Sequence, residues 1–258
     1  MKLITICVLT AAAVTLAASS AFAETMTWTV AGEKRQAIVY APTAASPGGK
    51  VPLVLSFHGR GDDMENFQHT AIHRAWPQAA VVYVQGLPTA STLRGWQNEK
   101  GQDNDRDLKL VDAALASLRT RFNVDDTRIY ATGFSNGAAF TYLLWAERPG
   151  VFAAYAPVAG RLRPSVQLTQ PRPVFHVAGR TDPQILFVDQ QAAIEAAIRA
   201  DGVAGKSTSC GNECTVYGAG SAAPVMTWIH PGGHTYPNST SERIAAFFRE
   251  HPRPKPKD

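Results

Sequence analysis

The sequence contains little cysteine and little charge. Of its 258 residues three are cysteines, 18% are charged and 45% are hydrophobic. Two of the cysteines, Cys210 and Cys214, lie in the segment SCGNEC, with no further Cys or His nearby at the spacing of a metal site. A zinc-binding module is therefore not indicated. In an exported chain such a pair favours a disulfide that closes a short loop, and two free thiols are the alternative.

The small net charge argues against a nucleic-acid partner or a membrane surface. The formal charge is +4, and the basic residues are scattered except in the terminal segment HPRPKPKD, residues 251–258. Proline that alternates with lysine and arginine is typical of a solvated chain end. We therefore expect a disordered tail over these residues rather than a nucleic-acid-binding arm.

Long apolar stretches are absent apart from one at the N-terminus. Lys2 precedes an apolar segment from Leu3 to Leu16, and Ala21-Phe22-Ala23 is typical of a cleavage site. Because no charged stop-transfer flank follows, the segment predicts a cleaved signal peptide over residues 1–23 rather than a membrane anchor. We expect the remaining chain to be secreted or periplasmic, without a membrane span.

From residue 51 onward, short apolar runs alternate with helical patterns. The run VPLVLSF, residues 51–57, is nearly continuously apolar, as a strand buried on both faces requires. The alternation predicts an α/β fold in one domain over residues 24–250, with a mostly parallel sheet covered by helices on both faces. Further strands are expected at 79–84, 128–133, 173–179 and 225–230, helices at 64–75, 105–122, 136–147, 187–200 and 241–250, and an antiparallel edge pair at 26–30 and 35–40.

The segment YATGFSNGAA, residues 130–139, joins a predicted strand to a predicted helix. Ser135 lies at the junction, between Gly133 and Gly137, as in the nucleophile elbow of hydrolases. A sharp turn there lifts the hydroxyl above the sheet edge, and a Cβ at either glycine would crowd the turn. The context favours Ser135 as a nucleophile; the alternative is a tight turn without chemistry, because a GxSxG pattern also arises by chance.

A serine nucleophile needs a base and an acid that orients the base, and in α/β-hydrolases they follow in the order Ser, acid, His. Asp182 follows a predicted strand, at the end where parallel sheets hold their sites. The alternative is that Asp182-Pro183 only begins a turn. We favour His234 as the base because it lies in a Gly-rich loop after the last predicted strand. The other histidines lie in or at the end of strands, upstream of the serine or in the tail: His58, His69, His73, His176, His230 and His251.

An oxyanion hole is expected from two backbone N–H groups, each worth about 3 kcal/mol of transition-state stabilisation. One is that of Asn136, next to the nucleophile. The other is that of Arg60 in the loop SFHGRGDD, with Gly59 as the alternative. His58 is expected to hold this loop by hydrogen bonding. Asp62 and Asp63 are expected to cap the helix that follows rather than to bind a metal.

Several segments in order resemble one group of enzymes. FHGRGDD, GW, VDDTRIYATGFSNGAAF, FAAYAPVAG, VAGRTDP and GGHTYP, spread between residues 27 and 250, are similar to the polyhydroxybutyrate depolymerase and feruloyl esterase-like group of the α/β-hydrolases. The resemblance implies the α/β-hydrolase fold and a serine esterase without metal or cofactor. It implies a triad, two oxyanion donors and one residue near the substrate entrance: Ser135, Asp182 and His234; Arg60 and Asn136; and Trp96.

The sequence departs from the group's pattern at two places. Residues 231–237 read PGGHTYP where the group often has GGGHTWP, and Arg60 stands where a Cys is frequent. We expect the Arg60 side chain to face solvent; the alternatives are a narrowed pocket or a preference for an anionic substrate. Trp96 and Tyr236 are candidates for an aromatic platform in the substrate pocket, with packing in the core or at the rim as the alternative.

Together these patterns predict a secreted or periplasmic serine ester hydrolase that forms an acyl-enzyme. The expected substrate is a small ester or a soluble polyester oligomer. Two alternatives share the fold, an acyltransferase and a peptidase, and a third is a catalytically inactive binding protein. The sequence predicts neither the acyl and alcohol specificity nor the oligomeric state.

Overall fold

The computed structural model describes residues 23–43, 48–205 and 207–254. The expected signal peptide, apart from its last residue, lies outside the described residues, as do the last four residues of the expected tail. Residues 251–254 follow the last helix without regular structure, and the Arg253 N–H donates to the Thr127 carbonyl. Within the described ranges, no helix has both the length and the apolar character needed to cross a membrane.

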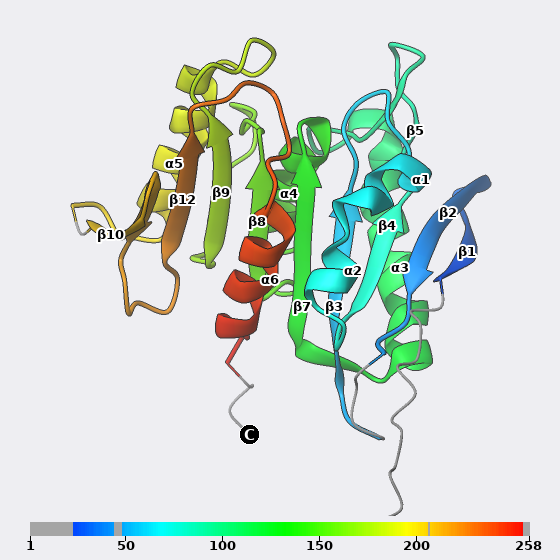
Figure 1. Cartoon of the computed structure of the whole chain (residues 1–258). Coiled ribbons are helices and arrows are strands. Elements are labelled where there is room, and N and C mark those ends of the chain that lie inside the picture. The colour runs from blue at the N-terminus through cyan, green and yellow to red at the C-terminus, as the bar shows by residue number, and fades with distance from the viewer. Residues whose placement is uncertain (1–22, 44–47, 206, 255–258) are drawn as a thin grey trace, which may run out of the picture.

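A ten-stranded sheet runs through the whole molecule, in the order β1-β2-β4-β3-β7-β8-β9-β12-β11-β10 (Figure 1). The six central strands, β4 to β12 in that order, pair in parallel, and antiparallel pairs extend both edges. The predicted fold class is confirmed. The strands are β1 (Ala23–Val30), β2 (Glu33–Tyr40), β3 (Val51–Phe57), β4 (Ala80–Val84), β7 (Val124–Phe134), β8 (Ala154–Val158), β9 (Val174–Gly179), β10 (Ser207–Gly211), β11 (Cys214–Tyr217) and β12 (Val225–His230). A small separate hairpin is formed by β5 (Leu87–Pro88) and β6 (Arg94–Gly95).

Helices cover both faces of the sheet (Figure 1). On one face α3 (Arg106–Phe122), α4 (Asn136–Glu147) and α5 (Phe187–Ala200) bury their apolar residues in one core cluster. On the other face α1 (Met64–Phe67), α2 (Ile72–Ala75) and α6 (Thr240–Glu250) contribute to a second cluster. Short 3-10 helices lie at η1 (Gln68–Thr70) and η2 (Gln102–Asp105).

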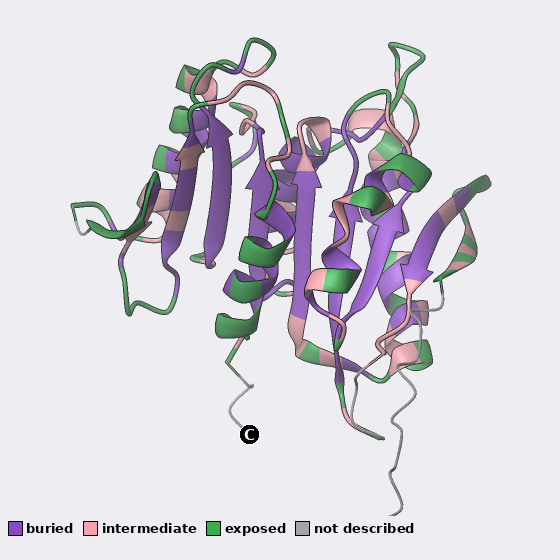
Figure 2. Cartoon of the chain, viewed as in Figure 1, coloured by how far each residue is buried: buried purple, intermediate pink, exposed green. Residues whose placement is uncertain are grey.

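Burial explains why the central strands are continuously apolar. Every residue of β3, β4, β8 and β9 is buried, because helices pack on both sides of these strands (Figure 2). The edge strand β1 instead alternates between exposed and half-buried residues. The strand β8 was not predicted, and neither was the β10–β11 hairpin, whose first strand is wholly exposed and carries no apolar signal.

The single helix predicted over residues 64–75 is wrong. The chain forms two short helices separated by a 3-10 turn, and it breaks at Ala71, whose φ of 60° is left-handed. Asp63 caps α1 as expected, since its carboxylate accepts from the Asn66 N–H at 2.8 Å. The break lies next to a contact between segments that are distant in the sequence, in which Ser241 Oγ donates a hydrogen bond to the carbonyl of Thr70.

The last helix also begins differently from the prediction. It starts at Thr240, and Ser239 at its N-cap makes no side-chain hydrogen bond. Ser241 therefore does not cap the helix; its hydroxyl donates to the Thr70 carbonyl in η1, as described above.

Cys210 and Cys214 form a disulfide, with their Cα atoms 5.0 Å apart, which confirms the predicted pairing. The bond closes the turn of the β10–β11 hairpin at the edge of the sheet. It therefore lies many strands away from the end of β7, where the segment containing Ser135 begins.

Candidate active site

Ser135 lies in a sharp turn between β7 and α4. Its backbone has φ 56° and ψ −113°, and its N–H donates to the Val158 carbonyl at the end of β8. A Cβ on Gly137 would lie 2.1 Å from the Phe57 carbonyl oxygen, and one on Gly133 would lie 2.4 Å from the Gly137 carbonyl. These contacts are with backbone atoms that cannot rotate away, so the two positions need glycine. The turn thus has the geometry expected of a nucleophile elbow.

Asp182 lies in the loop after β9 and is 4% exposed. Its Oδ1 accepts from the N–H groups of Gln184 at 2.8 Å and Ile185 at 2.9 Å. Its Oδ2 accepts from the Gln190 amide at 3.0 Å and from His234 at 2.7 Å. With four hydrogen bonds on two oxygens, the carboxylate is held in one orientation.

His234 lies in the loop after β12 and joins the other two groups. Its Nδ1–H donates to Asp182 Oδ2 at 2.7 Å, and its Nε2 accepts from the Ser135 hydroxyl at 2.9 Å. The loops bearing the acid and the base pack closely, because a Cβ on Gly179 would lie 2.3 Å from the Gly233 carbonyl oxygen. The structure therefore brings together Ser135, His234 and Asp182 in the arrangement that serine hydrolases use.

Other histidines are occupied elsewhere. His176 is fully buried, its Nδ1 is 2.7 Å from the Tyr142 hydroxyl, and burial lowers its pKa to about 4. Burial also lowers the pKa of His73 to about 4, and this ring stacks on Tyr40. His230 Nδ1 accepts from the N–H of Gly232 at 3.1 Å.

The loop after β3 packs directly against the serine turn. A Cβ on Gly59 would lie 3.1 Å from the Phe134 ring and 3.6 Å from Ser135 Cβ. His58 holds this loop as expected: its Nδ1–H donates to the Gly59 carbonyl at 2.7 Å, and its Nε2 accepts from the Gly86 N–H at 2.9 Å.

Two backbone N–H groups near the serine remain available. The Gly61 N–H donates to Arg94 and the Asp62 N–H to Gly59. Among the residues that the structure describes, the N–H groups of Arg60 and Asn136 donate to no protein group. Both residues line the same cavity as Ser135, so these donors can serve a ligand oxygen.

The Asn136 side chain forms hydrogen bonds that connect the serine turn to a neighbouring loop, and the sequence did not predict this role. Its Oδ1 accepts from the Trp96 N–H at 2.7 Å, and its Nδ2 donates to the Trp96 carbonyl at 3.2 Å and to Asn98 at 2.8 Å. The close approach depends on Gly95, where a Cβ would lie 2.6 Å from Asn136 Oδ1.

Trp96 and Tyr236 do not form a shared aromatic platform. Trp96 is fully buried, because it stacks on Phe140 and its indole N–H donates to the His58 carbonyl at 2.8 Å. This burial matches the alternative of core packing, and Trp96 also lies in the wall of the serine cavity. Tyr236 lines a separate depression, and its hydroxyl is 3.0 Å from Ser241 Oγ.

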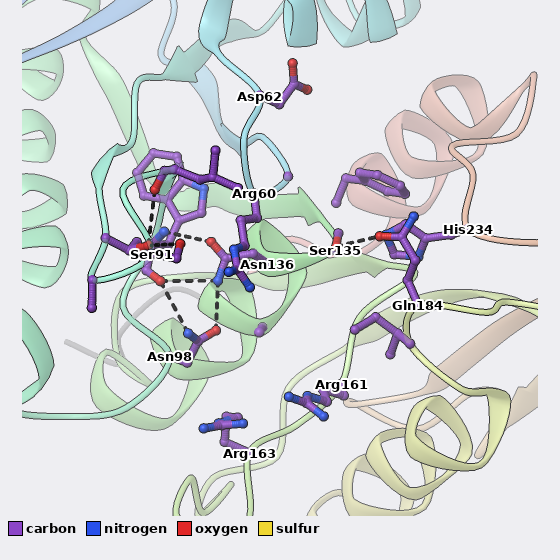
Figure 3. Close-up of a pocket in the computed structure, with 18 of the residues that line it drawn as sticks. Arg60, Asp62, Ser91, Asn98, Ser135, Asn136, Arg161, Arg163, Gln184 and His234 are labelled. Carbon is purple, nitrogen blue, oxygen red and sulfur yellow. Dashed lines mark hydrogen bonds between the residues drawn. The ribbon is translucent and has the colours of Figure 1, made fainter.

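A cavity of about 900 Å³ opens over Ser135 and His234 (Figure 3). This volume accommodates a small organic ligand. Its walls come from loops at the carboxyl ends of β3, β7, β8, β9 and β12 and from the β5–β6 hairpin. Within the described ranges, no group of three or more His, Cys, Asp or Glu side chains is placed to hold a metal ion.

Gln190 is a further residue of the site that the sequence did not reveal. It is fully buried in α5, and its amide donates both to Asp182 and to the Ile185 carbonyl at 2.7 Å. A glutamine inside a helical pattern normally faces solvent, so nothing in the sequence distinguished it.

Comparisons with known proteins identify sequence relatives. The chain is 33% identical over 161 residues to a bifunctional acetylxylan esterase/xylanase, XynS20E, of Neocallimastix patriciarum, which covers 58% of this chain and 22% of that protein. It is 29% identical over 253 residues to "Putative esterase NocK" of Nocardia uniformis, covering 82% and 73%. It is 26% identical over 134 residues to feruloyl esterase C of Emericella nidulans, covering 50% and 47%. The match thus spans about a fifth of the first relative and about half of the third, and no family model matches the chain.

A solved structure gives the same fold. The acetyl xylan esterase from Aspergillus awamori superposes with a TM-score of 0.68 over 88% of this chain and 99% of that chain, at 12% sequence identity. At this identity the likeness shows the fold alone. The chain therefore has the α/β-hydrolase fold, and its sequence is similar to proteins named as acetylxylan and feruloyl esterases.

Proposed function

We propose that this chain is a serine carboxylic-ester hydrolase in which Ser135 is the nucleophile, His234 the general base and Asp182 the group that orients it. The observation that carries the proposal is the unbroken chain of hydrogen bonds, 2.9 Å from Ser135 to His234 and 2.7 Å from His234 to Asp182. The curated relatives named as esterases support the same reaction class.

The reaction begins when Ser135 Oγ attacks the ester carbonyl and its proton moves to His234 Nε2. The carbonyl oxygen becomes an oxyanion, which the N–H groups of Arg60 and Asn136 stabilise. Asp182 stabilises the imidazolium and keeps the ring in the correct tautomer. The intermediate then expels the alcohol, which takes the proton from Nε2, and an acyl-enzyme remains.

Water completes the cycle in the same way. It loses a proton to His234 Nε2 as it attacks the acyl carbonyl, and the second intermediate releases the acid while the proton returns to Ser135. This sequence consumes one water and needs no oxidant, reductant or cofactor. The proposed substrates are small esters, aryl esters of the feruloyl type or soluble hydroxybutyrate oligomers.

The test of the nucleophile is Ser135→Ala, with Ser207→Ala in the exposed strand β10 as a matched control. Hydrolysis of 4-nitrophenyl acetate is expected to fall by at least about 10³-fold in the first variant and to stay unchanged in the second. A fluorophosphonate is expected to label the protein at Ser135, as mapped by peptide mass spectrometry. Retained activity in Ser135→Ala, or a label on another residue, would refute the assignment.

A panel of methyl ferulate, hydroxybutyrate trimer and 4-nitrophenyl esters separates the substrate classes. Adding an alcohol acceptor measures how the acyl-enzyme partitions, and transfer that exceeds hydrolysis at low acceptor concentration would make the chain an acyltransferase.

Export is part of the proposal and is supported by the disulfide between Cys210 and Cys214. Expression of the full chain in a bacterium is expected to give a periplasmic or secreted product that begins at Glu24, and N-terminal sequencing measures this. A product that stays in the cytosol with Met1 intact would contradict it.

A further inference from the structure

The cavity over Ser135 carries more positive than negative charge. Its lining includes Arg60, Arg161 and Arg163 but one carboxylate, Asp62. The whole chain is almost balanced, with 25 basic and 21 acidic residues. The positive charge at this cavity is therefore a local concentration, in a place where it acts on a bound substrate.

The fold brings the three arginines to one cavity from distant parts of the sequence. Arg60 follows β3, and Arg161 and Arg163 follow β8. Because β3, β7 and β8 are parallel neighbours, their carboxyl ends meet at the same edge of the sheet, around Ser135. In Figure 3, Arg60 lies beside Asn136, and Arg161 and Arg163 lie together on another side of the pocket.

These guanidinium groups keep donors free for a ligand. Arg163 contacts Glu99 at 3.1 Å, and Arg161 is 4.0 Å from Asp189, at the limit of an ion pair. In the part of the chain that the structure describes, Arg60 takes part in no salt bridge. Since a guanidinium carries five N–H donors, each of the three has some left over.

Among the described residues, the carboxylate of the lining forms no salt bridge with the three arginines. Asp62 Oδ1 instead accepts from the Asn66 side chain of helix α1 at 2.7 Å. Asp62 also lines the neighbouring depression, so it lies at the border of the cavity.

We infer that the cavity selects esters that carry a carboxylate near the scissile bond. The inference rests on the proposed function, because it assigns a substrate class to the same site. Arginine binds a carboxylate through two parallel hydrogen bonds, which a neutral group of the same size cannot accept with equal strength. The side chains of Arg161 and Arg163 are 43% and 36% exposed. Solvent therefore screens the attraction, and the preference is about tenfold rather than a thousandfold.

The test compares matched pairs of esters that differ in one charge. For a carboxylate on the acyl side, mono-4-nitrophenyl adipate is compared with its methyl ester. For a carboxylate on the leaving group, 4-acetoxybenzoate is compared with its methyl ester. Each kcat/KM is divided by the rate constant for hydroxide-catalysed hydrolysis, so that the ratio within a pair reports recognition rather than intrinsic reactivity.

The expected ratio of anionic to neutral ester is about tenfold in favour of the anion for at least one pair. It is expected to approach one in the double variant Arg161→Gln/Arg163→Gln, and to fall for the wild-type protein in 0.5 M NaCl, because salt screens exposed charges. The control is Arg199→Gln on α5, whose side chain is 68% exposed and lies outside the cavity. This control is expected to keep the wild-type ratio.

Two results overturn the inference and leave the proposed function in place. One is Ser135-dependent hydrolysis with equal normalised rates within both pairs, and the other is a ratio that survives in the double variant and in salt. The salt series on the wild-type protein decides the matter even where the double variant does not fold. If none of the four esters is hydrolysed in a Ser135-dependent manner, the proposed function fails, and this inference fails with it.

Discussion

Gln190 is expected to set the turnover rate although it does not line the cavity. Its amide donates to Asp182 Oδ2 at 3.0 Å and to the Ile185 carbonyl at 2.7 Å, and it is fully buried. Gln190→Met removes both donors and keeps a similar side-chain volume. Gln191→Met is a matched control, because Gln191 is the next residue of α5 and is exposed.

The magnitude follows from the partners of Asp182. A hydrogen bond to a charged group contributes about 1.5–3 kcal/mol, and three other donors still hold the carboxylate in the variant. If half of that energy is used to orient His234 in the transition state, the barrier rises by about 0.75–1.5 kcal/mol, which lowers kcat by about four- to twelvefold. KM is expected to stay within about twofold, since Gln190 touches no bound substrate. The free energy of unfolding is expected to fall by about 1–3 kcal/mol.

A pH series distinguishes positioning from general loosening. Gln190→Glu places a second carboxyl group about 3 Å from Asp182, and two carboxylates at such a distance do not both ionise readily. The Glu variant is expected to lose activity relative to Gln190→Met as pH rises. Steady-state kinetics on 4-nitrophenyl acetate with urea unfolding gives both quantities. The reasoning is refuted if Gln190→Met matches Gln191→Met in kcat, or if the Glu and Met variants share one pH profile.

Three further outcomes follow from other parts of the structure. Gly137→Ala is expected to lower kcat/KM by at least about 10²-fold and to destabilise the fold, because the new Cβ meets backbone atoms at 2.1–2.7 Å. The control is Gly150→Ala, where a Cβ has no atom within 4 Å. Equal behaviour of the two variants in kinetics and urea unfolding would contradict this prediction. Burial raises the pKa of Asp201 from 3.8 to about 7, so its contribution to stability is present below about pH 4 and is lost as pH rises through 7. Between these pH values, the free energy of unfolding of Asp201→Asn is expected to rise relative to that of the wild type by at most about 1.4 kcal/mol per pH unit. A difference in urea unfolding that does not depend on pH would argue against this. Reduction of the disulfide between Cys210 and Cys214 is expected to lower the free energy of unfolding by at most about 2 kcal/mol, because the closed loop is short. Esterase activity is expected to stay unchanged. A loss of activity at unchanged stability would contradict the placement of the hairpin away from the site.

The sequence predicted the elements whose environment is uniform. β3 and β12 were expected with the bounds observed, and so were α4 and α5. Such elements are specified by their own apolar pattern, because β3 and α4 are buried along nearly their whole length and α5 buries one face. The prediction of one helix over residues 64–75 was wrong because the chain breaks at Ala71. The break lies beside contacts with a segment about 170 residues later in the sequence, including the hydrogen bond from Ser241 to Thr70.

The same distinction holds for the site. Ser135 was predicted from its place between two glycines at a strand-to-helix junction, Asp182 from its place after a strand and His234 from its Gly-rich loop after the last strand. All three follow predicted strands, and the carboxyl ends of parallel strands meet at one edge. The contribution of Gln190 was not predictable, since it depends on how α5 turns relative to the Asp182 loop. The burial of Trp96 depends in the same way on the path of the loop between the small hairpin and η2.

The order of the strands has a consequence for how activity appears during folding. Ser135 follows β7 in the middle of the sheet, whereas His234 follows β12, which pairs with β9 and completes the parallel part. The base reaches the serine only after nearly the whole chain is in place, so no N-terminal fragment holds the assembled site. Contacts between residues so distant in sequence form late. The first turnover of a newly made molecule would therefore mark the completion of its fold, which makes hydrolysis a sensitive reporter of the native state.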